Sequence, residues 1–370
     1  MKKIKVFILF LLILFCTGIT VSASETGNEE VFGKEINTLI DDFLNSVPQE
    51  AGLDLERDHL SEGIGFDRFL ISITDAIEGK QPELLKFFAT VFGFAIVCVV
   101  CEFWTYSSQS SRKNTETAVL AVMAASIYPH MYSVFCEVRE GLISVCAFFG
   151  SAMPALTAIT TASGAVKSAG VQAMNMSIVL GAVGSGAVKL LLPLSFCMLA
   201  LALISSFGEG RIQSISKAIK NIFTFGLGIV SAVSSAIIAL QSVIAGASDS
   251  AALRAARYAA SGLIPVVGSS VSAALSTLAG GLAYAKSTVG AVAIFVLLVL
   301  AIVPLITLLL YRLIFSVSVF FLEFVDSSGG VRCFQAFRSA IDAVISVYVM
   351  SILVFIIQFI VFMKGGAFSI

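Results

Sequence analysis

Charged residues are scarce in this chain. Only 13% of its 370 residues are Asp, Glu, Lys or Arg, against about 25% in an ordinary soluble domain. Hydrophobic residues make up 58%, and several apolar runs exceed roughly 18 residues, the length typical of a transmembrane helix. The scarcity of charge excludes a soluble globular class, and the long runs predict an all-α, polytopic helical membrane protein.

The sequence also lacks the motifs of common enzyme and metal sites. It has two histidines, His59 and His130, and no His-Glu-x-x-His motif, phosphate-binding loop or Gly-x-Ser-x-Gly nucleophile elbow. Cys98 and Cys101 form a Cys-x-x-Cys pair, but no second pair or nearby His completes a zinc site. We therefore expect no enzymatic activity, no catalytic residues, no metal and no cofactor.

Residues 1–23 have the anatomy of a secretory signal peptide. Three lysines precede a short apolar run at 6–19, and small residues suit cleavage after Ala23. An uncleaved anchor helix is the alternative. In both cases the segment that follows is exported across the membrane.

The segment 24–84 is acidic and holds more than half of the chain's 24 Asp and Glu residues. Apolar spacing near 3.6 residues predicts two amphipathic helices, the first broken at Pro48 and the second ending before Pro82. Because two such helices have little core of their own, we expect an extracytoplasmic helical region that packs on the membrane body or on a partner. Simple solvation of an exposed face is the alternative explanation of its acidity.

Residues 85–370 form the predicted multi-span membrane domain. About seven or eight spans are expected, and Pro129 is expected to interrupt the second apolar block. The small-residue segments near 142–187 and 262–285 stay open as fully spanning or re-entrant. The expected apolar blocks are Leu84–Trp104, Ala118–Phe135, Leu142–Thr161, Met174–Phe207, Ile222–Ile244, Val289–Tyr311 and Ala343–Met363.

Two basic residues, Lys189 and Arg312, lie inside these apolar blocks. Ionisable groups within the membrane are costly and are often functional. We therefore predict both as intramembrane charges. The acidic residues of the domain fall mostly at segment ends, which disfavours an ion-coupled transporter.

The stretch 261–281, SGLIPVVGSSVSAALSTLAGG, has small residues at a spacing of four: Gly268, Ser272, Ser276 and Gly280. On a helix this spacing makes one smooth stripe, which lets another helix approach closely. Packing within one chain, contact between subunits and lining of a pore all stay open. Just upstream, Asp249, Arg254 and Arg257 are predicted to contact a partner or lipid phosphates, with snorkelling to the interface as the alternative.

The run GASDSAALRAARYAASGLIPVVGSSVSAALSTLAGGLAYAKSTVG, and most specifically Asp249–Gly268, resembles the stage III sporulation protein AE family of endospore-forming Firmicutes. The resemblance implies a multi-pass protein of the mother-cell membrane around the forespore, with its N-terminal region in the intermembrane space. It implies partnership with the other proteins of the stage III sporulation A operon and with a forespore-side partner. The implied assembly is a channel or secretion-like complex needed for forespore development after engulfment and for late forespore gene expression.

A stand-alone secondary permease for a small solute is the alternative function. Such proteins carry inverted repeats with paired broken helices, and the Gly- and Ser-rich segments 177–187 and 262–285 are consistent with that, although no internal repeat is clear. In either case we expect contact with membrane lipid, an oligomeric assembly and no nucleic-acid partner.

Overall fold

The computed structural model describes residues 66–104, 109–162, 166–204, 215, 217–237 and 268–364 except Asp326. These residues all belong to one compact unit, Thr38–Ile370. They are helical apart from the short connection at 325–327, and the described part of the chain contains no strand. The predicted all-α class is confirmed.

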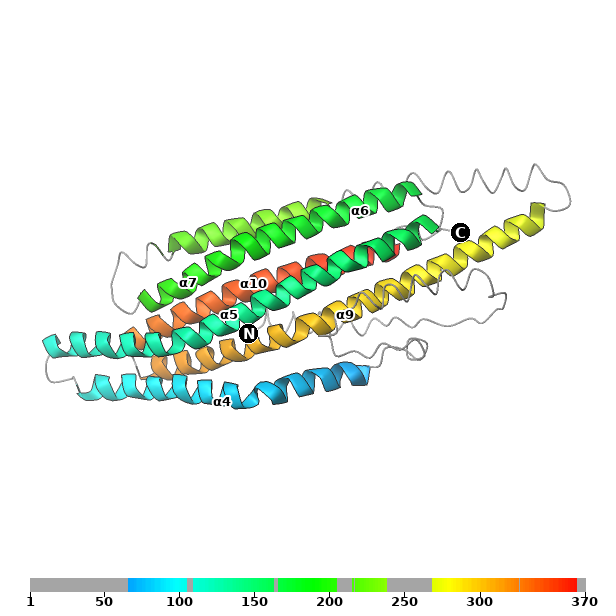
Figure 1. Cartoon of the computed structure of the whole chain (residues 1–370). Coiled ribbons are helices and arrows are strands. Elements are labelled where there is room, and N and C mark those ends of the chain that lie inside the picture. The colour runs from blue at the N-terminus through cyan, green and yellow to red at the C-terminus, as the bar shows by residue number, and fades with distance from the viewer. Residues whose placement is uncertain are drawn as a thin grey trace. The chain divides into compact units, whose positions relative to one another are not determined.

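The described helices are long and run alongside one another (Figure 1). They are α4 (Phe66–Trp104), α5 (Gln109–Ala162), α6 (Val166–Gly181), the π-helical segment η3 (Ala182–Leu191), α7 (Leu192–Ile204), α9 (Gly268–Phe324) and α10 (Ser328–Lys364). A further helix, Lys217–Ile237, precedes α9.

Six helical stretches in the described residues are long and apolar enough to cross a membrane, so the predicted helical membrane protein is confirmed. They are Lys80–Cys101, Thr117–Thr161, Ala169–Ala202, Lys217–Ile237, Val289–Phe324 and Gly329–Met363.

The break expected at Pro129 is wrong. Helix α5 runs without interruption through both Pro129 and Pro154, so the predicted blocks Ala118–Phe135 and Leu142–Thr161 are parts of one helix. Proline removes one helical hydrogen bond at a cost of about 3 kcal/mol, whereas α5 buries an apolar face on both sides of Pro129, with Ile127 and Met131 fully buried. Packing along the whole helix outweighs the local defect.

Helix α4 likewise runs through Pro82, where the second amphipathic helix was expected to end. The part of α4 that precedes Pro82 and the predicted first span are therefore one helix. The segment near 262–285 behaves in the same way, since from Gly268 onward it is the first part of the 57-residue helix α9.

Helices α9 and α10 form a hairpin around which the others pack. The backbone N–H of Ser327 donates to the carbonyl of Leu322 at 3.1 Å, and that of Val331 donates to Ser327 at 3.1 Å, which closes a tight connection. Helix α10 contacts α5, α7 and α9, whereas α4 packs against α5 and α9. The core of the bundle is rich in fully buried aromatic side chains, among them Phe148, Phe149, Phe334, Phe355 and Phe359.

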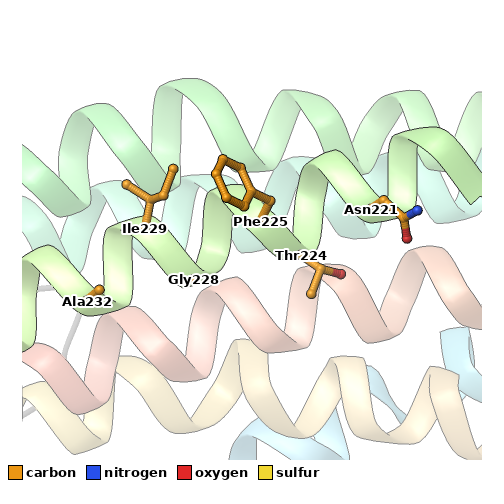
Figure 2. Close-up of a pocket in the computed structure, with 6 residues that line it drawn as sticks. All are labelled: Asn221, Thr224, Phe225, Gly228, Ile229 and Ala232. Atoms are coloured by element: carbon orange, nitrogen blue, oxygen red, sulfur yellow. The ribbon is translucent and has the colours of Figure 1, made fainter.

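The helix Lys217–Ile237 lies at the edge of the bundle. It packs against η3 through glycines: a Cβ added to Gly186 would lie 2.7 Å from Val230, and one added to Gly226 would lie 3.0 Å from Leu191. An open hollow of about 600 Å³ follows its outer side and is lined by this helix alone (Figure 2). Because Phe225 in the hollow is 70% exposed and no second element faces it among the lining residues, we interpret the hollow as lipid-facing surface.

Candidate functional site: a charged layer across the helices

An ion pair joins α9 to α10 in the middle of their apolar lengths. The guanidinium of Arg312 contacts the carboxylate of Asp342. The two side chains are 23% and 42% exposed. Each charge lies within an apolar stretch of more than 30 residues, where an unpaired charge would be costly. The structure therefore places the predicted charge Arg312 in a helix and supplies its counter-ion.

A second ion pair joins α4 to α5. The ammonium group of Lys80 contacts the carboxylate of Glu137, with 30% and 42% of the side chains exposed. Glu137 lies near the middle of the 45-residue apolar stretch of α5. The pair thus connects the long central helix α5 to the helix that leads into the bundle.

Aromatic contacts bring the two ion pairs to nearly the same level. The ring of Phe87 on α4 lies 5.8 Å from His130 on α5 and 4.6 Å from Tyr311 on α9. Lys80 precedes Phe87 by seven residues and Glu137 follows His130 by seven, whereas Arg312 follows Tyr311 directly. At 1.5 Å per residue, the ion pairs lie about 12 Å from each other along the helices. We call this level, defined by Lys80, Glu137, Arg312 and Asp342, the charged layer.

Lys189, the other predicted intramembrane charge, lies near the Glu137 side of this layer. A Cβ added to Gly150 of α5 would lie 3.3 Å from Leu180, and the rings of Phe135 and Phe196 are 5.5 Å apart. Lys189 lies between Leu180 and Phe196 in the sequence, so its level on α5 lies between Gly150 and Phe135. Counting residues between these two contacts places Lys189 within about one helical turn of Glu140 along the helices. Lys189 is exposed, and it makes no ion pair with any residue that the structure describes.

The backbone around Lys189 is a π-helix of ten residues, Ala182–Leu191. π-Helical turns are rare and are often associated with function. Gly181, Ser185 and Lys189, spaced by four residues along and just before this segment, are all exposed.

Next to the charged layer, α5 approaches α9 and α10 closely at a glycine. A Cβ added to Gly141 would lie 2.9 Å from the Cγ atom of Pro304 and 3.7 Å from the hydroxyl of Tyr348. That hydroxyl is buried and has no hydrogen-bond partner among the described residues. The glycine thus permits the three-helix contact that supports the layer.

The sequence did not identify Asp342 and Glu137 as partners of the predicted charges. One pattern could have found Asp342, because Arg312 and Asp342 lie 15 residues before and after Ser327, which lies between α9 and α10, and an antiparallel hairpin places equidistant residues side by side. Glu137 gives no comparable pattern, because it lies 28 residues after the start of α5 whereas its partner Lys80 lies 24 residues before the end of α4.

The small-residue stripe Gly268, Ser272, Ser276 and Gly280 lies within α9, so its predicted helical geometry is confirmed. The surroundings of these side chains, and the whole of Asp249, Arg254 and Arg257, lie outside the described residues. The packing or pore role of the stripe and the partner or lipid role of the charged residues stay predictions.

Replacing Gly268 or Ser272 by Leu is expected to disrupt complex formation without affecting membrane insertion, because a bulky side chain on the stripe blocks close helix approach. Membrane fractionation measures insertion, and co-purification with partner proteins measures assembly. Normal assembly of both variants would contradict the role of the stripe. Ala274→Leu, a replacement on the opposite side of the same helix, is the control.

Comparison with known proteins decides the family. The family model of stage III sporulation protein AE matches residues 64–366, which include every helix of the charged layer. The chain belongs to this family. Stage III sporulation protein AE of Bacillus subtilis (strain 168) is 20% identical over 284 residues, which cover 76% of this chain and 71% of the relative. No solved structure matches the chain.

Membership of the stage III sporulation protein AE family confirms the resemblance derived from residues 246–290 and assigns the chain a role in sporulation. The matched range contains Lys80, Glu137, Lys189, Arg312 and Asp342. The charged layer therefore lies in the part of the chain that defines its membership.

Proposed function

We propose that this member of the stage III sporulation protein AE family is a non-catalytic membrane component of a channel or secretion-like complex between mother cell and forespore. The match of the family model to residues 64–366 carries this proposal, because it covers the entire described helical body. The two ion pairs support it: they connect α4 to α5 and α9 to α10 at one level, as suits a rigid scaffold for other subunits.

The proposed location is the mother-cell membrane around the forespore, with the acidic region 24–84 in the intermembrane space. The proposed partners are the other proteins of the stage III sporulation A operon and a forespore-side protein. The acidic segment offers these partners an exported, charged surface, while the basic residues of the body stay mostly on the membrane and cytoplasmic side.

Deletion of the gene in the native spore-forming host tests this function. We expect engulfment to finish, the forespore then to shrink, and late forespore-specific transcription to fail, because the forespore loses its supply route. Time-lapse microscopy of forespore size and a late forespore reporter measure the two effects. Restoration by the gene in trans is the control, and normal spores in the deletion strain would contradict the proposal.

A stand-alone permease is the second candidate, and the charged layer is the observation that favours it. Paired ionisable groups inside a helical bundle are typical of coupled transporters, and η3 interrupts a long apolar helix beside the layer. Purified protein in liposomes distinguishes the two functions. Saturable uptake of one solute by this chain alone would favour the permease, whereas co-purification with partner membrane proteins and no uptake alone would favour the complex.

A further inference from the structure

The exposed apolar surface of the bundle is longer than the hydrocarbon core of a bilayer is thick. Val122 on α5 is 61% exposed and Met174 on α6 is 66% exposed. From the contact of Gly150 with Leu180, these two residues lie about 50 Å apart along the helices at 1.5 Å per residue. The hydrocarbon core is about 30 Å thick. Even at a tilt of 40°, the upper end of the usual range, the two residues differ in depth by about 38 Å.

At least one end of this exposed apolar surface therefore lies outside the hydrocarbon core. Exposed apolar side chains in water are unfavourable, and large exposed apolar patches mark sites of interaction with protein or membrane. A protein partner with an apolar surface of similar length would cover the side chains that lie beyond the hydrocarbon core.

The charged layer adds a second requirement for the partner. Glu140 on α5 and Lys189 on η3 are both exposed, lie within about one turn of the same level, and make no ion pair with any described residue. Arg139 adjoins Glu140, but successive residues on a helix do not face each other. On α4 the exposed Glu83 and Lys86 are three residues apart. At this spacing opposite charges are neighbours on the helix surface and can interact with each other.

We propose that this surface binds a second copy of the same chain, with Lys189 of one copy opposite Glu140 of the other. Two copies in one membrane lie at equal depth and orientation. Their apolar lengths and charged layers therefore coincide without any offset, and opposite charges at the same level meet. The exposed Gly181 and Ser185 beside Lys189 let the second copy approach closely. This self-association goes beyond the proposed function, because it requires no other sporulation protein.

Charge reversal in full-length copies with two different tags tests the contact. The copies are produced together in a non-sporulating bacterial host, and capture of one tag is followed by detection of the other. Lys189→Glu gives a copy with acids at both positions, and Glu140→Lys gives a copy with bases at both. Each variant is expected to capture itself at least about tenfold less than the unchanged chain, because like charges meet in the contact. Mixing the two variants is expected to restore capture to within about twofold.

Restoration in the mixture distinguishes contact between copies from a contact within one chain or from misfolding, since neither of these is repaired by a second variant. Lys217→Glu, at an exposed lysine away from the layer, is the matched control and is expected to leave capture unchanged. If a reversed variant does not accumulate, Lys189→Gln and Glu140→Gln replace the pair, and each should lower capture. Absence of self-capture by the unchanged chain, capture insensitive to all these variants, or no gain in the mixture would overturn the proposal.

Discussion

Asp342→Ala is expected to lower the stability of the bundle by about 1–3 kcal/mol, because it leaves the charge of Arg312 in an apolar bundle without its counter-ion. Breaking a fully buried ion pair costs about 3–5 kcal/mol. The smaller figure applies here because the two side chains are 23% and 42% exposed, so that water screens part of the interaction. The midpoint of thermal unfolding of the purified protein in detergent measures the effect.

The double variant Arg312→Leu with Asp342→Leu makes this prediction specific. Replacing both partners of an ion pair by apolar residues is often neutral or stabilising, so we expect the double variant to recover most of the stability that Asp342→Ala loses. Glu323→Ala is the control, because this exposed carboxylate at the end of α9 accepts only a 3.3 Å hydrogen bond from Gln335. A double variant less stable than either single variant would mean that the pair does not act as a unit.

The class of helical membrane protein could be predicted from the composition and from the length of the apolar runs. Apolar runs long enough to cross a bilayer are rarely compatible with a soluble structure. The helical geometry of Gly268, Ser272, Ser276 and Gly280 follows from their spacing, and the structure confirms it. Arg312 could be predicted as an intramembrane charge because the sequence alone shows a basic residue inside a long apolar run.

The continuity of the helices could not be predicted, because proline acts locally and packing acts over distance. At Pro129 and Pro82 the local sequence shows only the cost of placing proline inside a helix. The compensating packing energy comes from residues such as Phe87, which packs on His130 and Tyr311 from helices far apart in the chain. For the same reason Glu137 had no visible partner, since the register of α4 against α5 depends on contacts and not on spacing.

Gly141→Ala is expected to destabilise the protein, although alanine is the better helix former. The new Cβ would lie 2.9 Å from Cγ of Pro304, a ring atom that has no rotamer by which to move away. Overpacking of this kind costs typically 1–3 kcal/mol, against a gain of about 0.5–1 kcal/mol from replacing glycine within a helix. The net expected loss is about 1–2 kcal/mol, and Gly141→Leu should cost more by separating α5 from α9.

Two other glycines test whether the rigidity of the neighbouring side chain determines if a Gly→Ala replacement raises or lowers the stability. Gly93 on α4 has no atom within 4 Å of an added Cβ, so Gly93→Ala keeps the helix-forming gain and should raise the unfolding midpoint. Gly290 on α9 faces Met363, a flexible side chain that can rotate away, so Gly290→Ala should cost less than Gly141→Ala. If Gly141→Ala and Gly93→Ala shifted the midpoint equally, the close approach of α5 to Pro304 would not be a constraint on the bundle. Opposite shifts would show that the close approach of α5 to Pro304, about one helical turn from Glu137, constrains the bundle.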